Sequence, residues 1–317
     1  MIRSLALLAL RMITTLIVAS MILFALLRIM PGDPAQVALG LQASPEAVAA
    51  LRAEYGLDKP LVVQYLEWIG SFLTGNAGES LVTGQDMTPI VADRFAVTMW
   101  LVIPSVALSL LVAVLLGAWS ARRAGKPDAV LISLMTQGFM AVPAFLAGLL
   151  LVLLFSVKLG WLPASGWVAP NEGFGTFLSH LVLPVIALSL VQTAVLTRYV
   201  RTSMATVLRK DYIRSARARG LSKSAAIRRH GLRNAAIPVL TVAGLQLAAA
   251  VIGAVVIERV FDIPGLGDQL LISVEHRDMV TIQAIVMLLV TVTVVINAIV
   301  DALLVAVDPR LRVKAVA

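Results

Sequence analysis

Six long apolar segments dominate this sequence of 317 residues, and polar stretches separate them. A helix needs about 20 mostly apolar residues to cross the hydrocarbon core of a bilayer. Because hydrophobic residues make up 59% of the chain and charged residues only 14%, lipid should cover much of its surface. The pattern predicts an all-α, polytopic membrane protein with six transmembrane helices, at about residues 5–30, 97–119, 129–157, 181–200, 236–257 and 280–307.

Two of these segments differ from the others. The segment at 129–157 is longer than a span requires, and Gly138 and Pro143 interrupt it, which predicts a kinked or tilted helix. The first segment begins like a signal peptide, with Arg3 before an apolar run, but no cleavage site of small residues precedes residues 28–31. It is therefore expected to remain in place as the first span.

The distribution of Lys and Arg predicts how the chain crosses the membrane, since cytoplasmic loops carry an excess of these residues. With the N-terminus inside, nineteen of the 26 Lys and Arg residues lie on the inner side and seven on the outer side. The sequence thus predicts an N-in/C-in topology. The same bias explains the net charge of +8 without a nucleic-acid partner.

Three regions are expected along the chain. Residues 1–30 form the first transmembrane helix, residues 31–96 an extracytoplasmic amphipathic region, and residues 97–317 a five-helix core with a cytoplasmic loop at 201–235. Within the second region, Ser44 is a good helix cap because a proline and an acid follow it, and this helix should end near Gly56. A second helix is expected at 60–73, and a polar loop at 258–279.

The segment Asp211–Pro238 is polar and strongly basic, which a chain that merely spans a membrane does not require. Gly220 interrupts it, and Ser222 can cap a new helix, so the segment is expected to form a helix, a glycine turn and a short helix. Attraction to anionic lipid would explain the charge alone. The small residues between Ser215 and Leu221 indicate in addition a protein partner with a groove for a short helix.

Motifs for catalysis and for binding of nucleotides or metals are absent from the sequence. The three histidines, His180, His230 and His276, lie in separate regions, which argues against a histidine metal site. There is no Gly-x-Ser-x-Gly motif and no phosphate-binding Gly-x-x-x-x-Gly-Lys-Ser/Thr loop. If transport uses ATP, another chain must bind it.

Several polar residues lie within the apolar segments, where they are costly unless other helices bury them. They either form hydrogen bonds between helices or line a path for a solute. A centrally placed Asp, Glu, Lys or Arg is missing, which argues against an ion- or proton-coupled transporter. The candidates for the path are Gln137, Gln192, Gln246, Gln283 and Asn297.

The basic segment resembles the cytoplasmic EAA loop of ABC-importer permeases, in particular that of the dipeptide, oligopeptide and nickel permease family. Arg214-Ser215-Ala216 stands where the general pattern has Glu-Ala-Ala. The shared residues are Asp211-Tyr212, Arg214, Ala216 to Ser222, Arg229-His230 and Leu232 to Ala235. Further motifs of the family follow in order at residues 31–35, 55–60, 159–166, 258–267, 277–278 and 308–312.

This resemblance implies a fold like that of type I ABC importer permeases and a binding-protein-dependent import function in a bacterial-type inner membrane. The implied partners are a second homologous permease, two cytoplasmic ATPase subunits, an extracytoplasmic solute-binding protein and membrane lipid. ATP and Mg would bind to the ATPase subunits, and this chain would hold no cofactor or metal and catalyse no reaction. The residues implied in coupling to the ATPase are Asp211, Tyr212, Arg214, Ala216, Arg217, Ala218, Gly220, Leu221 and Ser222.

Di- and oligopeptides are the expected solutes, and glutathione or a nickel chelate are the alternatives within the same family. Outside it, the alternatives are an ion- or proton-coupled secondary transporter and a membrane enzyme or scaffold.

Overall fold

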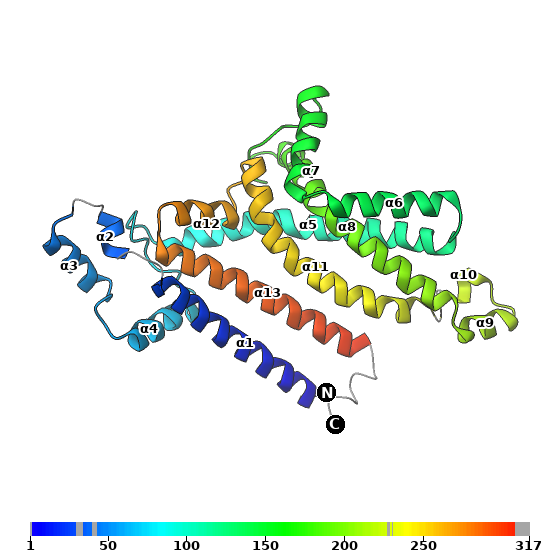
Figure 1. The fold of residues 1–317 in the computed structure, drawn as a ribbon, viewed down its shortest axis with the longest axis horizontal. Coiled ribbons are helices and arrows are strands. Elements are labelled where there is room, and N and C mark those ends of the chain that lie inside the picture. The colour runs from blue at the N-terminus through cyan, green and yellow to red at the C-terminus, as the bar shows by residue number, and fades with distance from the viewer. Residues whose placement is uncertain (1, 30–33, 40–42, 227–228, 230, 308–317) are drawn as a thin grey trace. The chain divides into compact units, whose positions relative to one another are not determined.

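A computed structural model describes residues 2–29, 34–39, 43–226, 229 and 231–307. The regular elements in these ranges are helices, joined by turns and one isolated bridge between Glu79 and Asp86. Five helices are long and apolar enough to cross a membrane. They are α1 (Ile2–Ile29), α5 (Met87–Arg122), α8 (Phe174–Leu208), α11 (Leu232–Phe261) and α13 (Met279–Val307) (Figure 1).

The third apolar segment is not one kinked helix but two helices bent by 104°. They are α6 (Pro127–Ala141) and α7 (Ala144–Leu151), and a π-helical turn, Val152–Lys158, continues α7. Pro143 explains the break, because it lacks an N–H group and keeps the preceding Val142 in an extended conformation. With this pair counted as one span, the six predicted spans are confirmed.

Several helices extend beyond the predicted spans, because apolar pattern alone set the bounds of those spans. α5 begins ten residues before the predicted start at 97, and α8 begins before 181 and continues past 200. The expected polar loop at 258–279 contains a helix, α12 (Leu266–Glu275). Leu266 and Ser273 of this helix are buried, so packing rather than a long apolar run supports it.

The helices form two compact units, and α1, α5 and α13 each contribute residues to both. One unit comprises residues 10–98 and 264–295. Besides α12, it contains three other short helices, α2 (Pro34–Leu39), α3 (Pro45–Glu54) and α4 (Leu61–Leu73). The predicted cap of α3 is confirmed, because the Ser44 hydroxyl accepts a hydrogen bond from the Ala47 N–H group.

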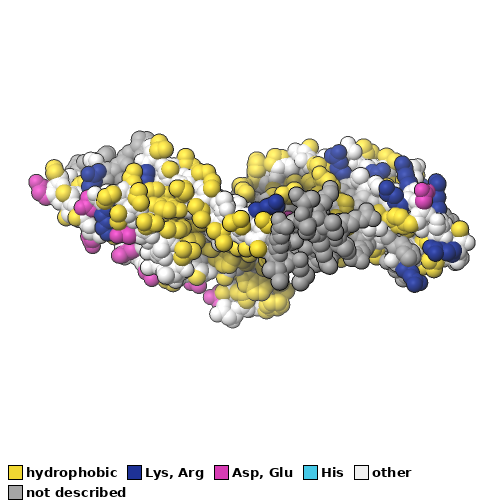
Figure 2. Space-filling model, turned by 90° about the horizontal axis from the view of Figure 1, so that it is seen from below, with side chains coloured by type: hydrophobic (Ala, Val, Ile, Leu, Met, Phe, Trp, Pro, Cys, Tyr) yellow, Lys and Arg dark blue, Asp and Glu magenta, His cyan; other side chains and the backbone are white. Residues whose placement is uncertain are grey.

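Two clusters hold this first unit together. Phe24 of α1 packs against Tyr65 and Trp68 of α4, and the Tyr65 hydroxyl shares a 2.8 Å hydrogen bond with the Ser20 hydroxyl. A second cluster joins the beginnings of α5, α12 and α13 through Met87, Val91, Leu266 and Ile285. In Figure 2, acidic side chains gather over the short helices of this unit.

The other unit comprises residues 1–9, 99–263 and 296–317, of which those up to 307 are described at its C-terminal end. Its central helix is α8, which packs against α6, α7 and α11 (Figure 1). Close approach of α5 and α8 depends on Gly117, since a Cβ atom there would lie 2.6 Å from the Cβ of Val200. α8 is thus in contact with α5, α6, α7 and α11.

Candidate functional site

The basic segment folds as predicted into a helix, a glycine turn and a short helix. α9 spans Asp211–Ala218 and α10 spans Lys223–Ala226. Gly220 lies between them with φ +92°, a conformation that residues with a Cβ rarely adopt. The Ser222 hydroxyl accepts a 3.2 Å hydrogen bond from the Ala225 N–H group at the start of α10.

One face of α9 is buried within this chain. Ile213 is 2% exposed and Ala216 is fully buried, three residues apart and therefore on the same side of the helix. They pack in a cluster with residues of α8, α10 and α11, and the half-buried Leu221 packs against it. The other buried members of this cluster are Ala121, Val200, Met204, Val207, Ala226 and Ala235.

The opposite face of α9 is exposed and charged. The side chains of Asp211 and Arg214 are 95% and 78% exposed, and they form a loose ion pair of 3.7 Å. A pair so exposed contributes little to stability. Ala218, Gly220 and Ser222 are exposed as well, whereas the side chain of Arg217 lies outside the described residues. Figure 2 shows basic side chains gathered over this end of the unit.

Two hydrogen bonds reinforce the attachment of the segment to α8 and α11. The Asn234 side-chain amide donates to the Tyr212 hydroxyl at 3.3 Å, which links α11 to α9. The Ser203 hydroxyl donates a buried 2.8 Å bond to the carbonyl oxygen of Ala235, which links α8 to α11. The basic segment is therefore fixed to the ends of both long helices.

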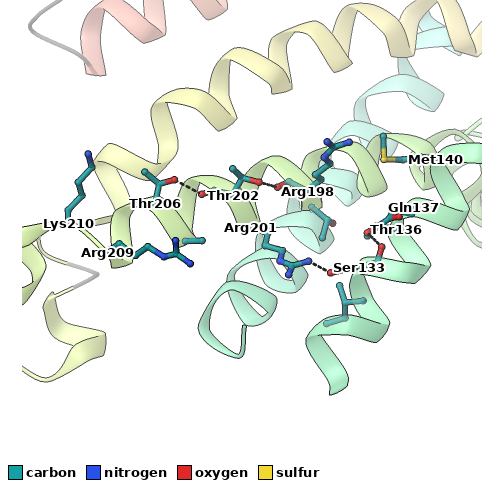
Figure 3. Close-up of a pocket in the computed structure, with 13 residues that line it drawn as sticks. Ser133, Thr136, Gln137, Met140, Arg198, Arg201, Thr202, Thr206, Arg209 and Lys210 are labelled. Atoms are coloured by element: carbon teal, nitrogen blue, oxygen red, sulfur yellow. Dashed lines mark hydrogen bonds between the residues drawn. The ribbon is translucent and has the colours of Figure 1, made fainter. Parts of the chain in front are cut away.

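A basic groove between α6 and α8 leads up to the start of α9 (Figure 3). It encloses about 940 Å³. Arg201 donates a hydrogen bond across the groove to the Ser133 hydroxyl, and Lys210 at its end directly precedes α9. Its lining residues are Ile132, Ser133, Thr136, Gln137, Met140, Thr197, Arg198, Arg201, Thr202, Ala205, Thr206, Arg209 and Lys210.

Sequence reasoning missed this groove, although a signal for it exists. Arg198, Arg201, Thr202 and Ala205 follow one another at helical spacing on one face of α8, and Arg209 continues this mostly polar stripe directly after the helix. The apolar pattern ends the fourth span near residue 200 and leaves residues 201–235 to an expected cytoplasmic loop, so it does not place this stripe on a single helix. That the stripe faces α6 could be known only from the packing.

The five polar residues predicted to line a path have different surroundings. Gln137 lines the groove, whereas Gln192 is buried and accepts a 3.4 Å hydrogen bond from Ser109 of α5. Gln246 is half-buried on α11 and Asn297 is exposed on α13. Gln283 belongs to the other unit, where it lines a separate cavity. The structure therefore brings Gln137 to the groove and gives Gln192 the role of a contact between helices.

Within the described ranges, no three or more His, Asp or Glu side chains gather in a way that could hold a metal ion. Nδ1 of His180 lies 2.9 Å from the carbonyl oxygen of Thr176, and His276 is exposed. His230 lies outside the described residues.

Comparisons with known proteins agree with this architecture. Residues 113–313 match the model of the family described as "Binding-protein-dependent transport system inner membrane component", and residues 1–102 match the model of its N-terminal region. A crystal structure of an amino acid ABC transporter with histidines has the same fold, with a TM-score of 0.52 and 16% identity. The match covers 68% of this chain and 93% of that chain.

Relatives of similar length are known by sequence. The glutathione transport system permease protein GsiC of Pectobacterium atrosepticum is 40% identical, over 96% of each chain. A probable peptide ABC transporter permease protein of Sinorhizobium fredii is 37% identical, over 95% of this chain and 97% of the relative. The chain therefore belongs to the family of inner-membrane components of binding-protein-dependent transport systems, the permease subunits of ABC importers.

Proposed function

We propose that this permease and a second, homologous permease form the transport path of an ATP-driven importer for di- or oligopeptides or for a peptide-like solute such as glutathione. Two ATPase subunits with ATP and Mg would act on the cytoplasmic side, and a solute-binding protein would deliver the solute from outside. The names of the relatives support a peptide or glutathione as the solute. The expected N-in/C-in topology would put the basic segment on the same side of the membrane as the ATPase subunits.

In this proposal α9, the Gly220 turn and α10 dock in a groove of one ATPase subunit. The observation that carries it is the two-sided character of α9: Ile213 and Ala216 are buried in this chain, while Asp211 and Arg214 are exposed. The inner face ties α9 to α8 and α11, so a displacement imposed on its outer face reaches both helices. ATP-driven closure of the ATPases would thereby tilt these helices and open the path alternately to either side.

This division of the segment assigns different roles to its residues. Asp211, Arg214, Ala218, Gly220 and Ser222 are exposed and can face a partner. Tyr212, Ala216 and Leu221 instead hold the segment to this chain. Arg217 stays a proposed anchor on the ground of the family motif alone.

The test is purification of the tagged permease from membranes, identification of the chains that co-purify, and measurement of ATPase activity stimulated by the binding protein. We expect a second permease and ATPase subunits. Gly220→Val should reduce stimulated activity by at least about tenfold, because a β-branched residue is strained at φ +92°. Gly220→Asn should retain most activity, since asparagine tolerates positive φ better.

Gly125 provides a matched control. It lies in the turn between α5 and α6 with φ +87°, and a Cβ atom there would meet open space, as at Gly220. Gly125→Val therefore introduces similar strain outside the basic segment. Equal loss of activity in both valine variants would contradict docking through the Gly220 turn. A permease that purifies without an ATPase, and whose transport survives ATP depletion but not a protonophore, would contradict the importer itself.

A further inference from the structure

The groove between α6 and α8 has a strongly one-sided charge. Four cationic side chains line it: Arg198, Arg201, Arg209 and Lys210. Of the described residues that line it, none is acidic. Nor do these four form a salt bridge with another residue in the part of the chain that the structure describes. Arg201 is half-buried and the other three are exposed, so their charge gives the groove and its mouth a positive potential.

Hydrogen-bonding groups accompany the charges. Thr197 is 2% exposed, and its hydroxyl oxygen lacks a hydrogen-bond partner among the described residues. A buried polar group without a partner is costly, so a ligand or water in the groove would satisfy it. Thr202 and Thr206 donate to backbone carbonyl groups of α8, and Gln137 lines the groove from α6 (Figure 3).

The arginine nearest to α6 is held in place. Arg201 donates a hydrogen bond to the Ser133 hydroxyl through one terminal nitrogen and is half-buried. Its guanidinium group carries further N–H donors in a fixed plane, which suits a carboxylate that accepts two parallel hydrogen bonds. Arg198 is exposed, one helical turn away on the same face of α8.

The length of the groove argues for a solute rather than a phospholipid headgroup. From Thr197 to the end of α8 at Leu208 the groove follows the helix for twelve residues, or about 18 Å, and Arg209 and Lys210 extend it further. The headgroup layer on one side of a bilayer is only about 6 Å thick. A single headgroup would occupy one end and leave most of the polar lining without a function. The volume of this open groove, about 940 Å³, is within the range of sites for small molecules.

We propose that this groove is a binding site for solutes with free carboxylate groups and a net negative charge, and that Arg198 and Arg201 bind those carboxylates on the inner part of the path. This inference rests on the proposed import function and adds to it the charge of the preferred solute. Arg209 and Lys210 continue the positive lining to the first residue of α9. A displacement of α9 would therefore change the groove at that end and help to release the solute.

Binding of charged and neutral peptides to the assembled transporter tests the proposal. The transporter is reconstituted without binding protein in nanodiscs of phosphatidylcholine, and the probes are tri-glutamate and tri-glutamine peptides with a fluorescent label. We expect tri-glutamate to bind at least about tenfold more tightly at low ionic strength, because charge-assisted hydrogen bonds are stronger than neutral ones. High salt should reduce this preference.

The variants Arg198→Gln and Arg201→Gln should each remove most of the preference for tri-glutamate. Arg201→Lys should restore it in part, since it keeps the charge but loses the planar donors. Arg122→Gln is the matched control, because it removes the same charge outside the groove. Arg122 is exposed at the end of α5. Arg198 is exposed, so its replacement leaves the packing intact even if Arg201→Gln disturbs the contact with Ser133.

Two outcomes would overturn the proposal. One is that both peptides bind with equal affinity, or that Arg122→Gln reduces the preference for tri-glutamate as much as Arg198→Gln and Arg201→Gln do. The other is that native mass spectrometry detects bound phosphatidylglycerol that depends on Arg198 and Arg201, while peptide binding does not depend on them. ATPase activity stimulated by the binding protein is measured in parallel. If it persists in the arginine variants while peptide preference is unchanged, the proposed site is wrong and the importer function stands.

Discussion

Ser80 donates a 2.6 Å hydrogen bond to the buried carboxylate of Asp278, a residue 198 positions away in the sequence. Thr281 donates a second bond of 2.6 Å to the same oxygen. Asp278 also accepts a long hydrogen bond from the Thr281 N–H group at the beginning of α13. The carboxylate thus links the turn before α5 to the beginning of α13 within one unit.

We expect Asp278→Ala to reduce the free energy of unfolding by about 3 kcal/mol, because two hydrogen bonds to a buried charge are lost and the hydroxyl groups of Ser80 and Thr281 lose the acceptor of their protons. Asp278→Asn should cost less, since its carbonyl oxygen still accepts. The measurement is thermal unfolding of the purified permease in detergent. An alanine variant as stable as the unchanged protein would show that water replaces the carboxylate at no cost.

Gly117→Ala should destabilise the contact between α5 and α8 by about 1–3 kcal/mol, because the new methyl group would lie 2.6 Å from the Cβ of Val200 and 2.9 Å from the Thr197 carbonyl oxygen. Gly138→Ala is the control. It also lies within a helix, a Cβ atom there would meet nothing within 4 Å, and alanine favours helices, so stability should stay equal or rise. Thermal unfolding distinguishes the two. The same loss in both variants would contradict close packing at Gly117.

Ile213→Ala should loosen α9 from α8, because Ile213 is 2% exposed and a large-to-small change in a core costs about 2–5 kcal/mol. The expected result is faster trypsin cleavage within residues 209–229. Arg214→Ala, at a side chain that is 78% exposed, should leave cleavage at the other sites unchanged. Equally slow cleavage in both variants would show that α9 does not depend on its buried face.

The turn before α5 should loosen in acid. Hydrogen bonds from Thr88, above all from its backbone N–H group, lower the pKa of Asp86 below the ordinary value. A lowered pKa in the folded state means that the stabilisation is present above the unfolded pKa, near 4, and is lost as the pH falls through the folded value. Hydrogen exchange at the first turn of α5 should therefore accelerate in acid, after correction for the intrinsic exchange rate. Asp86→Asn should remove that dependence, and an unchanged dependence would assign it to another group.

Much of the fold could be predicted because its main signals are local. The length of an apolar run indicates a span. Ser44 caps α3 by binding the N–H group of Ala47, three residues further on, and Gly220 provides a turn that few other residues allow. The site residues of the basic segment could be named from their motif. Their role in coupling to an ATPase stays a prediction, and the structure shows which of their side chains are exposed.

The rest depended on contacts between distant residues. Pro143 predicted an interruption but not the angle of 104° between the two helices. In the structure α7 packs against α8 and α11, and the sequence does not show these contacts. α12 has too few residues to resemble a span, and Leu266 and Ser273 are recognised as core positions only once their neighbours are known. The groove needs stripes from two helices, and no single stretch of sequence contains both.

The length of α8 has a mechanical consequence. Its 35 residues extend about 52 Å, whereas the hydrocarbon core measures about 30 Å. Unless α8 tilts strongly, part of it stands beyond the lipid as a lever arm, and Arg209, Lys210 and α9 follow directly at its C-terminal tip. A force applied at the tip has a longer arm than one applied at the membrane surface. In the proposed importer, a force exerted by a partner at this tip would therefore produce a larger torque on the transmembrane bundle than the same force exerted at the membrane surface.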